Sequence, residues 1–367
     1  MSFVLVLSEF LPVGLLPAIG QGLHTDTGTA GLVVVAPGLA AAVAAPLLTR
    51  ASGRLDRRPV LLVLAALITI SDALAALAPD LPVMLAARLL LGVGVGGFWA
   101  MGAGVGVRLV PPASANRATA LTTAGISAGT VVSLPLGSLI GLVANWRAAF
   151  VVSAAAALVS LLLLNFALPA LGPTTPSRYE TLTAVLRNRP IRRSLLVVAL
   201  VFFGHFAAYT YITPHLQRQA HFGPSAVTAT LLGYGLAGLA GNFLAGQAVG
   251  RSSRGVLLVA AAILAVAVLL LTRVHDGPLV VILVLAWGGA FGAVPLAGQA
   301  RVMELAGAGP ETALALLVTA SQTFLAAGSF TGGLLTGHAG TRAAFATGAV
   351  VVLLSMAVPV GRRRIGA

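Results

Sequence analysis

Four ionisable residues that could move protons or hold charge lie in otherwise apolar stretches of this 367-residue chain: Glu9, Asp72, Arg88 and His205. Glu9 has apolar neighbours on both sides. Because burial disfavours a charged carboxylate, proton exchange is the chemistry that this position favours. The alternative is that Glu9 lies near the end of its helix and is solvated. His205 is either a second titrating group or a neutral packing residue.

Asp72 and Arg88 are predicted to form a pair. Asp72 lies six residues from the end of its apolar stretch, and Arg88 lies five residues from the facing end of the next one. At about 1.5 Å per residue the two side chains are at similar depth. An unpaired arginine in hydrocarbon is costly, so Arg88 requires a partner. The pair is either a static structural bridge or a participant in proton transfer, and the residues alone leave both open.

A short charged segment, residues 53–58, separates two apolar stretches. It contains Gly53, Arg54, Asp56, Arg57 and Arg58. Glycine permits a tight turn, and Asp56 can accept from arginine side chains or from a helix N-terminus. We predict a cytoplasmic gate here, and the alternative is simple anchoring of the turn by positive charge.

Aromatic residues are only 6% of the chain, and they concentrate in a few apolar stretches. A cavity with aromatic faces and a few amides suits a flat, partly polar ligand. The alternative for most of them is ordinary core packing. The candidate substrate-binding residues are Phe98, Trp99, Phe206, Tyr209, Trp287 and Gln322.

The elements that must position these residues are membrane-spanning helices. With 58% apolar residues, 8% charged residues and a mean hydropathy of +1.00, the chain lacks the charged surface of a soluble protein. Apolar runs of about 20 residues recur, long enough to cross roughly 30 Å of hydrocarbon. We predict twelve spans at residues 2–22, 28–49, 59–78, 83–107, 117–142, 147–168, 193–214, 225–249, 255–272, 278–301, 312–336 and 342–361.

The arginines orient these spans. With both termini in the cytoplasm, seventeen of the 22 arginines fall in cytoplasmic segments and four in external ones, with Arg88 inside a span. This asymmetry follows the positive-inside rule. The net charge of +13 therefore reflects topology and contact with the lipid bilayer, and nucleic-acid binding is not expected.

Several kinds of site are excluded by composition. The chain has no cysteine, and its six histidines lack metal-ligand spacing, so neither a metal nor a cofactor is expected. The sequence also contains no nucleophile–base pair of the kind that would indicate an enzyme. The glycine-rich run at residues 92–97 lies inside an apolar span and follows no strand, so it is not a nucleotide-binding fingerprint.

An internal repeat organises the chain. Residues recur at an offset of about 196 positions, and Pro82, Gly92 and Gly96 align with Pro278, Gly288 and Gly292. The copies differ at Glu9/His205, Asp56/Ser253 and Arg88/Val284. We predict an all-α membrane protein of two pseudo-symmetric six-helix bundles, residues 1–168 and 193–367, joined by a cytoplasmic linker at 169–192.

Three motifs resemble the major facilitator superfamily. Residues 53–58 resemble its cytoplasmic gating motif, residues 88–97 its Arg-x-x-x-Gly-x-Gly motif, and Gly125, Gly129, Pro135 and Gly137 the Gly/Pro-rich motif of its antiporter branch. Residues 9–13, 96–101, 108–112 and 209–212 are similar to the bacterial purine ribonucleoside efflux pumps of the drug:proton antiporter branch. The resemblance implies export of purine nucleosides in exchange for protons.

We therefore expect a monomeric, proton-coupled exporter of the bacterial cytoplasmic membrane that works by alternating access. Glu9 carries the proton, and Asp72 with Arg88 holds or relays charge. Export of amphiphilic drugs, as in chloramphenicol exporters, or of sugars is the alternative within the superfamily. A passive channel and a membrane-embedded enzyme are the alternatives from other classes.

Overall fold

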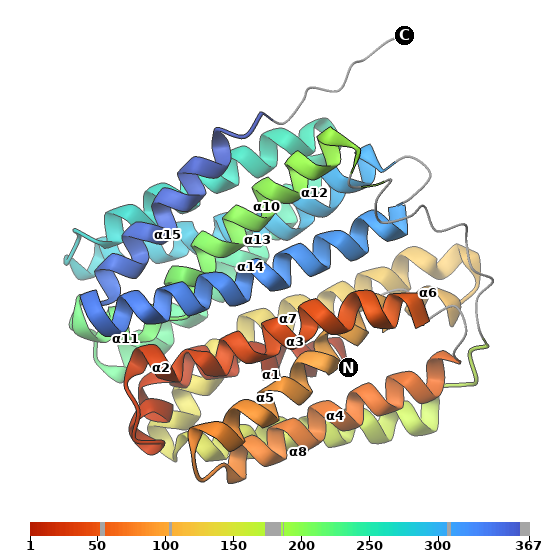
Figure 1. Cartoon of the computed structure of the whole chain (residues 1–367), viewed down its shortest axis with the longest axis horizontal. Coiled ribbons are helices and arrows are strands. Elements are labelled where there is room, and N and C mark those ends of the chain that lie inside the picture. Colours follow the sequence, from red (N-terminus) through yellow and green to blue (C-terminus); the bar gives the residue numbers. More distant parts are fainter. Residues whose placement is uncertain (52–55, 103–104, 173–184, 186, 307–309, 360–367) are drawn as a thin grey trace.

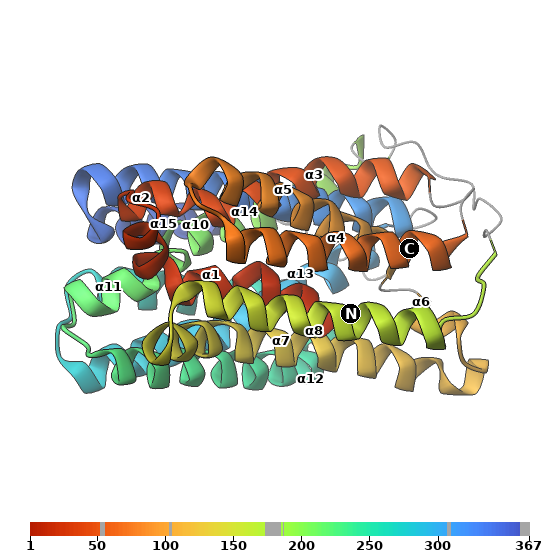
Figure 2. The same ribbon diagram turned by 90° about the horizontal axis from the view of Figure 1, so that it is seen from below.

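The computed structural model describes residues 1–51, 56–102, 105–172, 185, 187–306 and 310–359. Its helices run side by side along one common direction (Figures 1 and 2). The first half of the chain contributes α1 (Ser2–Gly22), α2 (Thr27–Ala30), α3 (Leu32–Ala51), α4 (Arg57–Leu77), α5 (Leu81–Gly97), the π-helix η1 (Phe98–Gly102), α6 (Val105–Arg108), the 3₁₀ turn η2 (Pro112–Ser114), α7 (Ala115–Val143) and α8 (Trp146–Ala167).

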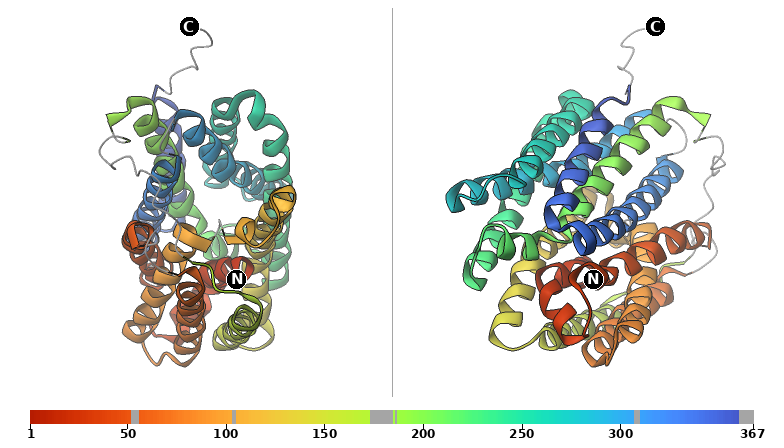
Figure 3. Two further views of the ribbon diagram at one scale, coloured as in Figure 1. Left: turned by 90° about the vertical axis from the view of Figure 1, so that its right-hand side faces the viewer. Right: turned by 60° about the vertical axis from the view of Figure 1, so that its left-hand side comes forward.

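The second half contributes the helices on the other side of the molecule in Figure 1, and Figure 3 shows the same two groups from two further directions. These are α10 (Arg189–Tyr209), α11 (Ile212–Arg218), α12 (Pro224–Leu271), α13 (Gly277–Leu305), α14 (Pro310–Ala339) and α15 (Thr341–Met356). The predicted domain limits at 168 and 193 fall close to the end of α8 and the start of α10. Most of the predicted linker lies outside the described residues, so that division stays a prediction.

The twelve predicted spans correspond to these helices. Nine described helices are long and apolar enough to cross a membrane, and Leu81–Gly97 and Thr341–Met356 are shorter apolar helices. The 48-residue α12 contains two spans, because Ser252 has non-helical angles (φ −163°, ψ 93°) and interrupts it. Apolar side chains cover the outer surface, as Phe166 (84% exposed) and Leu77 (77% exposed) illustrate. Such side chains suit contact with lipid.

Three spans are less regular than predicted. The span at 28–49 is broken at Gly31 between α2 and α3, and the span at 193–214 begins earlier, at Arg189, and is broken between α10 and α11. The span at 83–107 passes through the π-helix η1, which contains Phe98 and Trp99. A π-helical turn inserts extra backbone into a helix and commonly marks a functional segment.

The repeat is visible in equivalent contacts of the two halves. The Asp80 carboxylate accepts from the Val83 N–H, and 196 residues later the Asp276 carboxylate accepts from the Leu279 N–H, both at 3.0 Å. Each aspartate caps the first turn of its helix, α5 or α13.

Glycines of the repeat allow matching helix approaches. A Cβ at Gly92 would collide with the Pro37 backbone of α3, and a Cβ at Gly288 would collide with the Tyr234 backbone of α12. Small residues permit such close packing in a membrane. The predicted glycines of α7 act in the same way, because a Cβ at Gly137 would lie 2.6 Å from the Leu11 carbonyl oxygen of α1.

The two halves meet along a seam that is well packed at one end of the molecule. We call this the distal end: it holds the end of α1, α2, α11 and the turn between α14 and α15 (left in Figure 1). Here the Thr213 hydroxyl donates to the Val13 carbonyl oxygen (3.0 Å), and Arg218 Nη2 donates to the Thr27 hydroxyl (3.1 Å). The fully buried Tyr211 donates to the Ser329 carbonyl oxygen (2.9 Å), and its hydroxyl packs against Gly31 of the first half.

Candidate functional site

Arg88 of α5 is fully buried among four helices of the first half. Its Nε donates to the Val33 carbonyl oxygen (3.1 Å), and its Nη2 donates to the carbonyl oxygens of Ser8 (3.0 Å) and Glu9 (3.1 Å). The sequence explains why two of these carbonyl oxygens lack their usual helical N–H donor and can accept from Arg88. Proline has no N–H, so a proline four residues later leaves a helix carbonyl without its donor. Pro37 follows Val33 at this spacing, and Pro12 follows Ser8.

The predicted Asp72–Arg88 pair is present, with Arg88 Nη1 and Asp72 Oδ1 3.9 Å apart and both side chains wholly buried. The shorter contacts of Asp72 are with two serines. The Ser8 hydroxyl donates to Oδ1 and the Ser153 hydroxyl to Oδ2, each at 2.6 Å. Asp72 therefore acts as an acceptor held by α1 and α8. This geometry suits a fixed carboxylate that offsets the arginine charge.

Glu9 is buried, with 4% of its surface exposed, so the alternative of a solvated side chain does not hold. Its Oε1 accepts from Nε2 of Gln322 in α14, at 3.3 Å. This hydrogen bond joins the two halves of the molecule. Gln322 Oε1 has no hydrogen-bond partner among the described residues. Protonation would give the Glu9 carboxyl an O–H donor. The free Gln322 amide oxygen is an acceptor on the side chain that already contacts Glu9.

His205 of α10 is fully buried in an aromatic cluster of the second half. Its ring stacks on Phe291 (centroids 3.4 Å apart) and on Tyr209 (4.7 Å). The Trp287 indole N–H donates to His205 Nδ1 at 3.0 Å, which requires Nδ1 to be unprotonated. His205 Nε2 has no partner within the described chain. The surroundings fit a neutral imidazole better than a second charged group.

The predicted substrate residues fall into two groups. Phe206, Tyr209 and Trp287 belong to the aromatic cluster around His205. Phe98 and Trp99 contact each other edge to face, with centroids 5.7 Å apart, in the first half. Phe10, next to Glu9, stacks on Phe206 at 5.8 Å and also packs against the first-half core that contains Phe98. Glu9 and Gln322 therefore lie where aromatic side chains of both halves come together.

The predicted cytoplasmic gate is described in part, since Gly53 and Arg54 lie outside the described residues. Asp56 caps α4, where its carboxylate accepts from the Arg58 N–H (2.8 Å), and it also accepts from the Leu171 N–H (3.2 Å). The Arg58 guanidinium donates to the Asn165 carbonyl oxygen (3.0 Å). Of the two kinds of partner that the sequence predicted for Asp56, the Arg58 contact is of the helix N-terminus kind. The Leu171 contact joins the start of α4 to the first residues of the predicted linker.

Sequence reasoning did not single out Ser8, Ser153, Thr213 or Glu304, and it named Tyr211 only within the motif at residues 209–212. Glu304 accepts from the Ser253 hydroxyl (2.8 Å) and pairs with Arg301 (3.1 Å), so the second half has an acid beside the position where Asp56 became Ser253. The sequence did contain one indication that a donor such as Thr213 was needed. Pro17 leaves the Val13 carbonyl without a helical donor, as Pro12 does for Ser8, and such carbonyls require donors from elsewhere.

Comparison with known proteins agrees with this architecture. The family model of the Major Facilitator Superfamily matches residues 1–319. The transcription regulatory protein OpdE of Pseudomonas aeruginosa is 33% identical over 359 residues, which cover 96% of this chain and 89% of that protein. The purine ribonucleoside efflux pump NepI of Escherichia coli K12 is 34% identical over 294 residues, 80% of this chain and 74% of that protein.

Solved transporters share the fold at low sequence identity. A bacterial homologue of the human lysosomal transporter Spinster, in an inward-facing and occupied conformation, has a TM-score of 0.78 at 14% identity and covers 97% of this chain and 93% of that one. The xylose transporter XylE from E. coli, in a partially occluded inward open conformation, has a TM-score of 0.76 at 16% identity, covering 97% and 94%. The chain is therefore a multi-pass membrane transporter, not an enzyme, and belongs to the major facilitator superfamily.

Proposed function

We propose that this transporter exports small molecules, with purine ribonucleosides as the first candidates, in exchange for protons. The observation that carries the coupling is the hydrogen bond between Glu9 and Gln322 across the two halves. An ionised Glu9 can only accept from the Gln322 amide. A protonated Glu9 can also donate to the unpaired Gln322 oxygen, so protonation changes how the halves are held together.

Arg88 and Asp72 hold the charge environment of this site. The Arg88 guanidinium touches the main-chain oxygen of Glu9, and Asp72 with its two serines provides the counter-charge. We assign this pair the static role and Glu9 the proton-carrying role. His205, whose Nδ1 is occupied by Trp287, packs the aromatic cluster and stands outside the proton path.

Purine ribonucleosides are favoured by two observations. A relative that is 34% identical is named a purine ribonucleoside efflux pump. Phe10, next to Glu9, stacks on Phe206 of the second half and packs against the first-half core that contains Phe98, and a purine ring stacks well on aromatic faces. The transcription role in the name of the Pseudomonas aeruginosa relative belongs to that protein.

The arginine distribution supports the orientation that we assign, with both termini in the cytoplasm and the chain in the bacterial cytoplasmic membrane. The distal end then faces outward. Its packed seam corresponds to a state closed to the outside, and two solved transporters in inward-facing or partially occluded inward open conformations have the same fold. Asp56, Arg57 and Arg58 then lie at the cytoplasmic face, where we keep the proposal of a gate.

The test is efflux from proteoliposomes loaded with radiolabelled adenosine. An imposed pH gradient, acid on the outer side, should drive adenosine out through the wild-type protein. Glu9→Gln removes the titrating group but keeps its size and its contact with Gln322. It should abolish the response to the gradient and retain adenosine exchange at equal pH.

The matched control is Asp80→Asn, which removes a carboxylate at the α5 N-cap and leaves an equally good cap. It should respond to the gradient as the wild type does. A Glu9→Gln protein that still follows the gradient would contradict proton coupling through Glu9. Wild-type efflux that ignores the gradient would indicate a passive channel, and gradient-driven export of chloramphenicol or a sugar but not adenosine would indicate the other exporters.

A further inference from the structure

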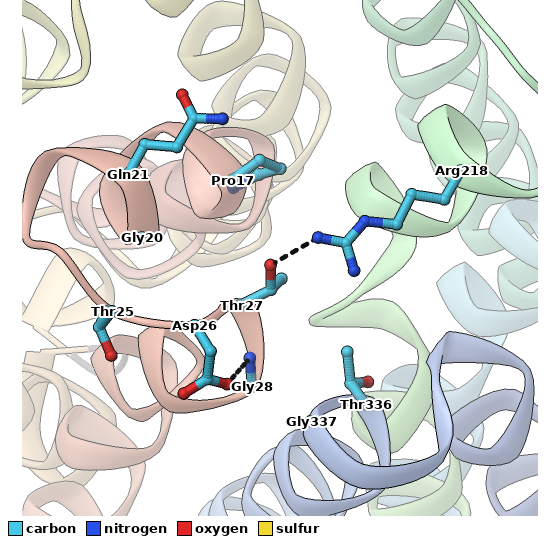
Figure 4. Close-up of a pocket in the computed structure, with 10 residues that line it drawn as sticks. All are labelled: Pro17, Gly20, Gln21, Thr25, Asp26, Thr27, Gly28, Arg218, Thr336 and Gly337. Carbon is cyan, nitrogen blue, oxygen red and sulfur yellow. Dashed lines mark hydrogen bonds between the residues drawn. The ribbon is translucent and has the colours of Figure 1, made fainter.

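A polar pocket of about 300 Å³ opens at the distal end, on the seam between the two halves (Figure 4). Its size is at the lower end of the range for small-molecule sites. It is separate from the Glu9 region. Its lining residues come from α1, from the turn into α2, from α11 and from the end of α14. The polar side chains of its lining are Gln21, Thr25, Asp26, Thr27, Arg218 and Thr336.

Both halves are needed to form this pocket. Arg218 of the second half reaches across and donates to the Thr27 hydroxyl of the first half, as the dashed line in Figure 4 shows. Behind it, Gly28 of α2 and Gly333 of α14 approach so closely that neither has room for a side chain. Separation of the halves at the distal end would therefore divide the pocket and remove the site.

Two side chains of the second half offer unused hydrogen-bonding groups. Thr336 is nine-tenths buried (6% exposed), lines the pocket, and its hydroxyl has no partner among the described residues. A buried hydroxyl without a partner is unfavourable unless a ligand or water satisfies it. Arg218 donates from Nη2 to Thr27, and the described residues provide no acceptor for its other guanidinium N–H groups.

The charge of the pocket favours a neutral ligand. Asp26 turns its carboxylate to its own helix: Oδ1 accepts from the N–H groups of Gly28 (2.8 Å) and Thr29 (3.0 Å), and the Thr29 hydroxyl donates to Oδ2. The Thr29 hydrogen bonds lower the pKa of Asp26, which keeps it ionised. Asp26 thus offsets the charge of Arg218 while its oxygens are already occupied. The remaining groups are the N–H donors of Arg218 and the side chains of Gln21, Thr25 and Thr336, which can donate and accept, and this mixture suits the hydroxyl groups of a ligand.

We propose that this pocket binds a neutral polyhydroxylated group, a ribose or a similar polyol, and that the bound ligand holds the distal seam closed. A ligand that binds only the closed state stabilises it by mass action, about eleven-fold at ten times its Kd. The outward direction rests on the proposed function. With the distal end outside, ribose-bearing product in the external solution slows further export.

The binding itself is tested without transport, by the thermal unfolding of purified protein with D-ribose as the probe. Ribose should raise the wild-type unfolding temperature in a saturable way. Thr336→Val keeps the shape of the side chain, removes the unpaired hydroxyl and breaks no hydrogen bond between described residues, so it should abolish this rise. Thr323→Val is the matched control, because Thr323 lies exposed on the same helix and bonds only its own turn. It should keep the rise.

A wild-type protein that D-ribose does not stabilise would overturn the proposal. Stabilisation that persists in Thr336→Val would also overturn it, since ribose would then bind elsewhere. The transport arm adds D-ribose outside or inside the adenosine-loaded proteoliposomes. Only external ribose should slow wild-type efflux, and Thr336→Val should be insensitive. If no adenosine efflux occurs in any protein, the proposed function fails while the unfolding assay still decides the ribose site.

Discussion

Thr213 donates its hydroxyl to the main-chain oxygen of Val13 in the other half of the molecule, at 3.0 Å. The acceptor exists because Pro17 cannot supply the N–H that would normally satisfy this carbonyl. A helix-weakening residue of α1 thus creates a buried acceptor, and the opposite half provides the donor. The hydrogen bond forms only while the halves meet at the distal end, so it ties the conformation of the transporter to one hydroxyl group.

Thr213→Val should loosen the distal seam. The change preserves shape but leaves the Val13 carbonyl unsatisfied, which costs about 1–3 kcal/mol. A shift of one or two kcal/mol changes a two-state ratio by a factor of about 5–30. The chain has no cysteine, so Thr336→Cys provides a single reporter inside the seam. Its labelling by a membrane-impermeant maleimide from outside should become at least about five-fold faster in Thr213→Val.

Two controls isolate the cause. Thr69→Val removes a hydroxyl that bonds only the Ala65 carbonyl of its own helix, and it should leave the labelling rate unchanged. Pro17→Ala restores an N–H to satisfy Val13, so Thr213→Val should have a much smaller effect in that background. An equal effect with and without Pro17 would show that the proline-freed carbonyl is not the reason for the contact.

Asp72→Asn should destabilise the first half strongly. The substitution keeps the contacts with Ser8 and Ser153 in shape but leaves the buried Arg88 charge without its counter-ion, and breaking a buried pair costs about 3–5 kcal/mol. We expect a lower unfolding temperature in detergent. The double variant Asp72→Asn/Arg88→Gln should recover part of the loss, because no uncompensated charge remains.

The measurement also separates the two roles that the sequence left open. If Asp72 is a static counter-ion, the double variant regains stability and the remaining activity still follows the pH gradient. If Asp72 carries the coupled proton, both Asp72 variants lose their response to the gradient although the recovered protein is folded. Arg88→Lys should not keep the wild-type unfolding temperature, because a lysine ammonium lacks the planar fork that reaches carbonyls of both α1 and α3.

Much of the fold follows from the sequence, because a span needs only a sustained apolar run and the repeat fixes which spans correspond. The Asp72–Arg88 pair also followed, since depth along two adjacent antiparallel helices is a one-dimensional quantity. The contacts of Glu9 with Gln322 and of Thr213 with Val13 did not, because they depend on how two six-helix groups dock. No spacing within either group encodes that docking. The free carbonyls at Ser8, Val13 and Val33 were readable from prolines four residues later, although their donors were not.

His205→Gln should leave the pH dependence of transport unchanged. Glutamine can still accept from the Trp287 indole N–H through its amide oxygen and cannot titrate. His205→Phe keeps the aromatic packing but leaves that N–H unpaired, so it should lower stability by about 1–3 kcal/mol. A His205→Gln protein with a shifted pH profile, measured from the initial rate of adenosine efflux, would assign His205 to the proton path.

Glu304→Gln should weaken the turn between the two spans of α12. In the first half, Asp56 occupies the equivalent turn, and Arg108, the repeat partner of Glu304, donates to the Gly172 carbonyl oxygen. In the second half the turn position holds Ser253, and the acid is Glu304 at the position equivalent to Arg108. Glu304 accepts from the Ser253 hydroxyl and pairs with Arg301. Loss of this partly buried pair should cost about 1 kcal/mol and lower the unfolding temperature.

Moving the acid between residues 253 and 304 tests whether the turns of the two halves are equivalent. Ser253→Asp alone should destabilise more than Glu304→Gln, because it places two carboxylates at hydrogen-bond distance. Ser253→Asp/Glu304→Arg reproduces the arrangement of the first half, with the acid in the turn and an arginine at the helix end, and should recover the wild-type unfolding temperature. If the double variant is no more stable than Ser253→Asp, the two turns do not stabilise their halves in equivalent ways.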